Sequence, residues 1–382
     1  MAKKKKRTTS KSTQTRKKPV RTKPKKTTRR SKRMTVEEKL HTSAPKKLAP
    51  QKGEPGKVST HKARASWFNA REAWPMRESP VDLLMGARAE AVANVPMQPG
   101  GATWMQAGPT NVGGRMTSIV VDPNDVDRIC VGAAGGGIWT STDGGLTWTS
   151  RWHDEPTLNI GALCLDPADT NTIYCGTGEA NLSADSHSGV GLYRSTDGGV
   201  LWHLLAPAAA HGLPRRIGRV AVDPFDSDHI LLAGVGHRAE DPRGLFVSTD
   251  RGNSWARALA ITPYPFQCHE VVFHPTIPGT IYVAIDAIGA MNGIWTSQDG
   301  GQSWTHLTSG LPSSSSIRRT SIAIAPSNPK VMYAQIASVR GAVLGIFRTG
   351  NGGSTWKEVS GAHFHQERQM NYNNTISVDP GD

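Results

Sequence analysis

The feature that most constrains this fold is an eight-residue motif, S-x-D-x-G-x-x-W, which recurs about every fifty residues along the chain. Four copies match it fully, and a fifth has Thr349 and Asn351 in place of the serine and the aspartate. The copies are Ser141–Trp148, Ser195–Trp202, Ser248–Trp255, Ser297–Trp304 and Thr349–Trp356. A motif copied at one spacing indicates that a single unit of structure is repeated.

The motif predicts a tight turn between two strands. Its aspartate can accept hydrogen bonds from amides of its own turn, and its glycine can take a positive φ without steric strain. The tryptophan then buries its ring beneath the turn. One carboxylate per turn offers too few oxygen ligands for calcium, so we expect a structural motif and no metal. The residues with this structural role are Ser141, Asp143, Gly145, Trp148, Ser195, Asp197, Gly199, Trp202, Ser248, Asp250, Gly252, Trp255, Ser297, Asp299, Gly301, Trp304, Asn351, Gly353 and Trp356.

Further β-rich segments precede each motif, and together they predict four strands per repeat. The first segment is an apolar run that ends in Asp-Pro or a relic of it, as in Ile119–Pro123 and Val220–Pro224. A second run rich in β-branched residues follows it. Sequential four-stranded units of this length stack radially as the blades of a β-propeller. We therefore predict an all-β propeller with five complete blades and, at Ile376–Pro380, the start of a sixth.

The segment Ala102–Ala107 has the pattern of an isolated fourth strand, with Trp104 in the place of the motif tryptophan. It would belong to the same blade as the strand that begins near Ile376, but that blade lacks its second and third strands. We therefore expect residues 101–382 to form a propeller that is truncated at its C-terminus. A complete propeller of this kind is expected to be a monomer.

The N-terminal part differs sharply in composition from the repeats. Residues 1–33 hold 17 Lys and Arg and no Asp or Glu, while the whole chain carries +14. Such a segment buries too little apolar surface to fold, so we predict a disordered tail and linker over residues 1–65. Residues 66–100 predict a short helical strap, with a helix over Ser79–Val95. The tail is either a solvated extension or an arm that binds nucleic acid or another anionic polymer.

The sequence gives little information on the cellular compartment. No apolar run is long enough to cross a bilayer, and no apolar segment follows the basic residues as it does in a signal peptide. Cys130, Cys164, Cys175 and Cys268 form no CxxC pair, so we expect reduced thiols that pack as small apolar groups. These observations favour an intracellular location without establishing it.

The repeated octets resemble the Asp-box (BNR) repeats of bacterial sialidases, sortilin-type receptors, xyloglucanase-type glycoside hydrolases and photosystem-assembly propellers. Members of this family are often exported, and the resemblance implies a propeller over residues 101–382. Sialidases of this kind carry an arginine triad and a Tyr–Glu nucleophile, with the first arginine in a Phe-Arg-Ile-Pro motif. Arg115 is the nearest candidate here and lacks that context. Xyloglucanase-type enzymes have a catalytic aspartate in a segment resembling TDIGG, where this chain has Ala134 within Ala133–Gly137.

We expect function on the face opposite the motif turns, where irregular loops join the second strand to the third and one blade to the next. Carboxylates and arginines in these loops suit a polar or anionic ligand. The candidate ligand-binding residues are Glu179, Asp185, His187, Arg216, Glu240 and Asp286. His363, His365 and Glu367 are too few ligands to predict zinc, and we expect no cofactor.

The sequence thus favours a non-catalytic scaffold that binds a protein or a glycan partner on its loop face. The alternative is a glycoside hydrolase of the sialidase or xyloglucanase type with a diverged or incomplete active site.

Overall fold

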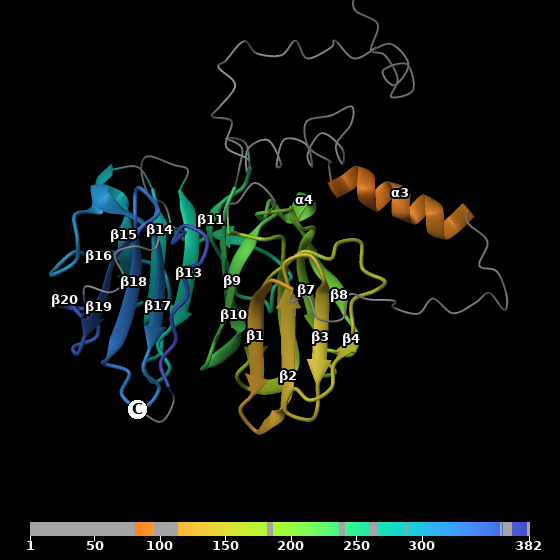
Figure 1. Ribbon diagram of the computed structural model, residues 1–382, viewed down its shortest axis with the longest axis horizontal. Helices are drawn as coiled ribbons and strands as arrows, with labels where there is room; N and C mark the ends of the chain where they lie inside the picture. The colour runs from red at the N-terminus through yellow and green to blue at the C-terminus, as the bar shows by residue number, and fades with distance from the viewer. Residues whose placement is uncertain are drawn as a thin grey trace, which may run out of the picture. The chain divides into compact units, whose positions relative to one another are not determined.

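The computed structural model describes residues 81–94, 114–181, 186–236, 241–259, 266–287, 289–359, 361 and 369–379. The described strands form five antiparallel sheets of four strands, here called blades 1 to 5 (Figure 1). Blades 1 and 2 contain β1 (Met116–Asp122), β2 (Asp125–Ala133), β3 (Gly137–Ser141), β4 (Thr149–Ser150), β5 (Ile160–Asp166), β6 (Asp169–Thr177), β7 (Gly191–Ser195) and β8 (His203–Pro207). Blades 3 to 5 contain β9 (Ile217–Asp223), β10 (Asp226–Gly234), β11 (Gly244–Ser248), β12 (Ala256–Arg257), β13 (Gln267–Phe273), β14 (Ile281–Asp286), β15 (Gly293–Ser297), β16 (Thr305–Leu307), β17 (Ile317–Ile324), β18 (Met332–Ser338), β19 (Val343–Thr349) and β20 (Lys357–Glu358).

The first strands of successive blades lie side by side, from β1 through β5, β9 and β13 to β17. Each blade follows the same order of strands, so all motif turns share one face, here called the turn face. The connections from second to third strands and those between blades share the opposite loop face. The prediction of an all-β propeller with five complete blades is therefore confirmed.

The sixth blade is where the structure departs from the sequence prediction. Residues 375–379, expected to form its first strand, are described but contain no strand. A first strand pairs with the second strand of its own blade, and no described segment supplies that second strand.

One apolar residue in the middle of each first strand packs against the preceding blade. Leu163, Val220, Val271 and Ile322 are each at most 3% exposed and lie in cores that combine two neighbouring blades. The equivalent Ile119 of blade 1 is 62% exposed, because no described blade precedes it. Hydrophobic burial between neighbouring sheets is thus what orders the blades into a series.

Four of the five motifs share one complete network of local bonds, and the fifth has part of it. In the first, Ser141 Oγ donates to Asp143 Oδ1 at 2.7 Å and accepts from the Gly145 amide at 2.9 Å. Trp148 Nε1 donates to the Gly145 carbonyl at 3.0 Å. The next three copies repeat these contacts. In the fifth, Thr349 and Asn351 reproduce the side-chain contacts of the serine and the aspartate, but the buried Nε1 of Trp356 has no hydrogen-bond partner among the described residues. The motif glycines have φ between 87° and 93°, a conformation that strains any residue with a Cβ.

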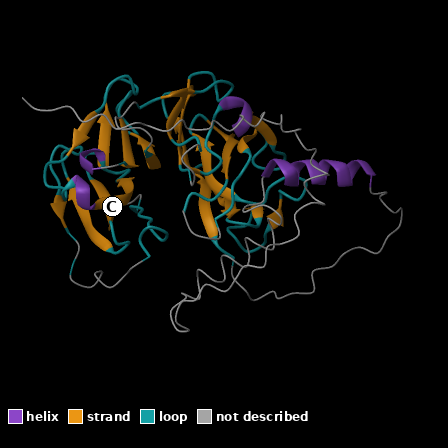
Figure 2. Ribbon diagram, turned by 90° about the horizontal axis from the view of Figure 1, so that it is seen from above, coloured by secondary structure: helices purple, strands orange, loops and turns teal. Residues whose placement is uncertain are grey.

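Helices are few among the described residues (Figure 2). The sequence predicts a helix over Ser79–Val95, and the structure has α3 at Val81–Asn94. Arg88 of α3 donates to the carbonyl oxygens of Glu155 and His153, which lie in the connection between β4 and β5. The short elements are α4 (Ala208–His211), η1 (Gly289–Met291) and η2 (Ser314–Ser316). No helix of the described ranges is long and apolar enough to cross a membrane.

Several expectations lie outside the described residues, namely the tail over residues 1–65, the strand at 102–107 and the segment with His363, His365 and Glu367. The four cysteines are described, and all are free thiols. Burial raises the pKa of the Cys130 thiol to about 12, so this side chain stays protonated at neutral pH.

Candidate functional site

All five first strands contain an irregularity in register close to their loop-face end. The residues within these bulges are Thr117, Gly161, Gly218, His269 and the pair Arg318–Arg319. A bulge bends its strand and changes the direction of nearby side chains, which is why bulges are common beside binding sites. The repeat therefore surrounds the loop-face end of the axis with redirected side chains.

Two of the bulges are glycines, and both allow a loop to approach closely. A Cβ on Gly161 would lie 2.1 Å from the carbonyl oxygen of Ile217 and 2.3 Å from that of Gly178. A Cβ on Gly218 would lie 2.9 Å from the Cβ of Ala180. The loop that leaves β6 therefore runs directly over the first strands, and this position brings Glu179 to the axis.

Glu179 is the centre of a group of polar residues that we call the axial cluster: Arg115, Glu179, Asn181, Arg319 and Tyr372. Arg115 Nη2 donates to Glu179 Oε2 at 2.7 Å, and the Tyr372 hydroxyl donates to Glu179 Oε1 at 2.8 Å. The Arg115 guanidinium also lies over the Tyr372 ring, 5.5 Å from its centroid. The Glu179 side chain is only 1% exposed, so it is a buried carboxylate held by a cation and a phenol.

Arg319 fixes the C-terminal segment, residues 369–379, against this cluster. Its guanidinium donates to Asn181 Oδ1 at 2.6 Å and to the carbonyl oxygens of Tyr372 at 2.9 Å and Asn374 at 3.3 Å. Asn374 Nδ2 donates back to the Arg319 carbonyl at 2.9 Å. Blades 2 and 5 are not neighbours in the series, so the contact of Asn181 with Arg319 crosses the axis. Burial lowers the pKa of Arg319 to about 10 against the opposing effects of Glu270, Glu179 and Tyr372.

A second acid, Glu270 of β13, lies beside the axial cluster. Arg219 Nε is 3.0 Å from Glu270 Oε1, which is an ion-pair distance, although the angles are not those of a hydrogen bond. Burial raises the pKa of Glu270, while Arg219 and Arg319 act against that shift. The neighbouring His269 has its pKa lowered to about 3 by burial and by Arg319 and Arg318, so its ring is neutral at physiological pH.

A third pair joins blades 4 and 5. Arg318 Nη1 donates to both carboxylate oxygens of Asp286, at 2.9 and 3.1 Å. Burial raises the pKa of Asp286, and the positive charge of Arg318 opposes the shift. Asp286 is thus a largely buried acid beneath a more exposed guanidinium.

The structure brings only some of the sequence candidates together. Glu179 lies in the axial cluster and Asp286 pairs with Arg318. His187 is exposed, and its carbonyl accepts the amide of Glu179. Arg216 is only 6% exposed and donates to the Ser186 carbonyl, which is a contact within the protein. The remaining candidates, Asp185 and Glu240, lie outside the described residues.

The sequence patterns do not predict four of the polar residues near the axis, namely Asn181, His269, Glu270 and Tyr372. The adjacent His269 and Glu270 interrupt an otherwise apolar first strand, and that interruption was an available signal. Tyr372 carries no such signal, because it follows the last motif and no repeated position predicts it.

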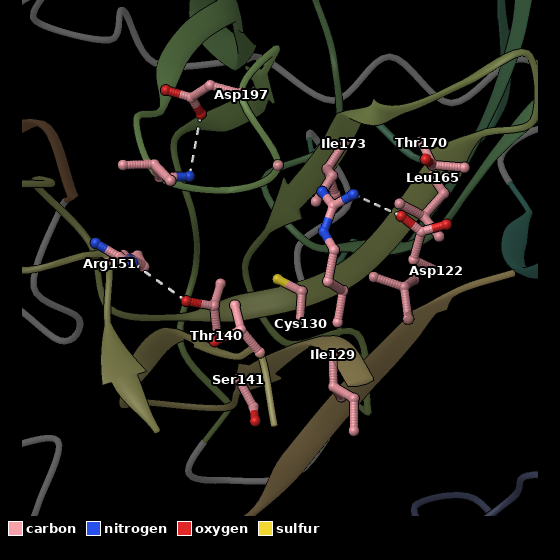
Figure 3. A pocket seen from close by; sticks show the side chains of 15 residues that line it. Asp122, Ile129, Cys130, Thr140, Ser141, Arg151, Leu165, Thr170, Ile173 and Asp197 are labelled. Carbon is pink, nitrogen blue, oxygen red and sulfur yellow. Dashed lines mark hydrogen bonds and ion pairs between the residues drawn. The ribbon is translucent and has the colours of Figure 1, made fainter. Parts of the chain in front are cut away.

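A cavity lies elsewhere, between blades 1 and 2 on the turn face (Figure 3). Its volume is about 140 Å³, and Asp122, Arg128 and Arg151 are among its polar lining residues. Arg128 Nη1 donates to Asp122 Oδ2 at 2.7 Å, and Arg151 Nε donates to Thr140 Oγ1 at 3.1 Å. These groups bind one another within blade 1, and none of them belongs to the axial cluster, so the cavity is a separate feature. Among the described residues, no group of three or more His, Cys, Asp or Glu side chains could hold a metal ion.

Comparison with known proteins finds similarity to a sortilin family model and to xyloglucanases. The family model described as "Sortilin, neurotensin receptor 3" matches residues 190–311. Xyloglucanase Xgh74A of Acetivibrio thermocellus is 28% identical over 306 residues, which cover 69% of this chain and 34% of that protein. The oligoxyloglucan-reducing end-specific xyloglucanase of Emericella nidulans is 28% identical over 218 residues, or 50% of this chain and 24% of that protein.

Among solved structures, an ancestral GH74 enzyme superposes with a TM-score of 0.53 at 24% identity, covering 69% of this chain and 34% of that enzyme. This likeness concerns the fold. The resemblance to the Asp-box propellers of sortilin and xyloglucanase type is therefore confirmed. This chain spans about a third of the length of xyloglucanase Xgh74A.

Proposed function

We propose that this chain is a non-catalytic binding module that holds a saccharide on its loop face, over the axial cluster. The observation that carries the proposal is the convergence of Arg115, Glu179, Asn181 and Tyr372 from two blades and the C-terminal segment. A carboxylate, an amide, a phenol and a guanidinium are the groups that bind sugar hydroxyls through directional hydrogen bonds.

The relatives support a saccharide as the class of ligand. Both are xyloglucanases, and similarity to them extends over half or more of this chain. A propeller fold by itself does not determine function, so the proposal depends on the cluster and takes only the ligand class from the relatives.

The absence of catalysis is proposed from the residue at position 134. The resemblance to xyloglucanases implies a catalytic aspartate there, and this chain has an alanine that is 5% exposed. The Ala134 amide donates to the carbonyl of Arg115, which fixes this segment beside the axial cluster. Without a carboxylate at this position, half of the pair of acids that glycosidases use is missing.

A glycoside hydrolase remains the second candidate, and one contact favours it. The Tyr372 hydroxyl is 2.8 Å from Glu179 Oε1, so the carboxylate could accept the phenolic proton as the oxygen attacks an anomeric carbon. Glu270, whose pKa is raised by burial, would then donate a proton to the leaving group.

Binding and turnover can be measured together on the full chain. We would screen a glycan array, titrate the saccharides that bind, including xyloglucan oligosaccharides, and follow the release of reducing ends. The proposal predicts binding without release, and a loss of about tenfold in affinity for Tyr372→Phe and Asn181→Ala. Tyr333→Phe, a tyrosine on blade 5 outside the cluster, is the matched control and should bind normally.

Two results would contradict the proposal. If no saccharide binds and a protein ligand does, the loop face serves protein recognition instead. If reducing ends accumulate and both Glu270→Gln and Tyr372→Phe abolish their release, the chain is a hydrolase.

A further inference from the structure

Three ion pairs near the loop-face end of the axis have the same layered arrangement. In Arg115–Glu179, Arg219–Glu270 and Arg318–Asp286 the nitrogen-to-oxygen distances are 2.7, 3.0 and 2.9 Å. The arginine side chains are 43%, 45% and 47% exposed, whereas their acids are 1%, 13% and 11% exposed. In each pair, therefore, the acid lies beneath the surface and the guanidinium is presented to solvent. We call the three guanidiniums the arginine rim.

The rim is spread over all five blades. Arg115 links blades 1 and 2, Arg219 links blades 3 and 4, and Arg318 links blades 5 and 4. Each buried acid fixes its guanidinium in place, so the three cations are held at separate positions around the axis. A ligand that contacts several of them must itself carry several acceptors.

A guanidinium in such a pair can still bind an outside anion. It has five N–H donors, more than one buried carboxylate satisfies, and its planar fork matches a second carboxylate. The nearby Arg319 adds a further positive charge, while His269 is neutral because burial and the arginines lower its pKa. The groups that the rim presents to solvent are therefore mainly guanidiniums, with their acids beneath them.

We propose that the arginine rim binds a polyuronate, a saccharide with carboxylates on successive sugars. This inference rests on the proposed function for the choice of a saccharide, and the rim supplies the reason for a repeated negative charge. Exposed arginines fixed from below lose little side-chain entropy on binding, which favours recognition over nonspecific attraction.

The test uses oligogalacturonate tetramers, their fully methyl-esterified form and galacturonic acid, titrated calorimetrically into the full chain. The free acid should bind about tenfold or more tightly than the ester, and the tetramer more tightly than the monomer. Arg219→Gln and Arg318→Gln should each weaken binding of the acid about tenfold and leave binding of the ester unchanged, which also reports that the variant is folded.

Arg251→Gln is the matched control. Arg251 pairs with Asp228 at 2.7 Å, is 58% exposed and lies on the turn face. The basic segment at residues 1–33 contributes equally to all variants, so the difference between Arg219→Gln and Arg251→Gln measures the rim alone.

Each other outcome has a defined meaning. Equal affinity for the acid and the ester, or equal losses in the rim and control variants, would overturn the proposed role of the arginine rim and leave the proposed saccharide binding intact. If polyglutamate binds as tightly as the uronate tetramer, the rim recognises acidic peptides, and the proposal that its ligand is a polyuronate is wrong. Binding of no saccharide at all would refute the proposed function as well.

Discussion

Replacement of two motif tryptophans by alanine tests the central claim that each blade packs onto the one before it. Trp202 of blade 2 is 7% exposed, and its ring centroid lies 5.3 Å from that of Trp152 in blade 1. Trp148 of blade 1 has no described blade before it and is 40% exposed. Both indoles donate to the carbonyl of their motif glycine, at 3.1 and 3.0 Å. The two sites therefore differ mainly in packing.

The difference in exposure predicts the difference in stability. The exposed fractions of the two side chains, 7% and 40%, differ by about a third. An indole buries roughly 200 Å², so the extra area that Trp202 buries contributes about 2 kcal/mol to stability at about 25 cal/mol per Å². The edge contact with Trp152 adds about 1 kcal/mol. We expect Trp202→Ala to lower the free energy of unfolding by about 3–5 kcal/mol, and Trp148→Ala to lower it by about 2–3 kcal/mol less.

The assay is urea unfolding of the wild type and both variants, followed by fluorescence and by circular dichroism. Coincident transitions would justify a two-state treatment, which repeat proteins do not always satisfy. Equal losses for the two variants would refute the reasoning, because they would mean that contact with the preceding blade contributes nothing.

Three further predictions follow from single residues. Gly161→Ala places a Cβ 2.1 Å from the Ile217 carbonyl and should destabilise by about 1–3 kcal/mol in urea unfolding, whereas Gly114→Ala, with nothing within 4 Å, should be neutral. Hydrogen bonds from its own turn lower the pKa of Asp250 to about 2, below the unfolded value, so its stabilisation is present above about pH 4 and is lost as pH falls towards 2. Asp250→Asn should flatten that acid dependence of the urea midpoint, and an unchanged dependence would contradict the assignment. NMR titration should show His269 neutral down to about pH 4, and a midpoint near 6.5 would contradict its burial beside Arg319.

The axial cluster gives the propeller a feature that its repeats do not predict. The motif turns are alike from blade to blade and lie on one face, whereas the cluster combines arginine, glutamate, asparagine and tyrosine side chains from three blades and the C-terminal segment. Arg115, Glu179 and Arg319 come from blades 1, 2 and 5, and Tyr372 comes from the C-terminal segment. Repetition therefore supplies the frame, and departures from repetition supply the chemistry.

The sequence by itself determined the blades, because the interactions that define them are local. The motif serine, aspartate and glycine bind one another within four residues, so their pattern is readable without knowledge of the fold. The apolar alternation of each first strand likewise reflects one buried face. The same reasoning located Glu179 and Asp286, since acids in long loops are visible in the sequence.

Only the tertiary structure decided which polar residues meet. Tyr372 contacts Glu179 across 193 residues of sequence, and Arg319 contacts Asn181 across 138. Such contacts depend on how blades are arranged around an axis and on bulges that redirect side chains, neither of which leaves a local pattern. The sequence also suggested Arg216 as a ligand-binding residue, but packing buries its side chain and directs it to the Ser186 carbonyl. The exposure of an arginine is set by neighbouring loops, and residue type alone does not reveal it.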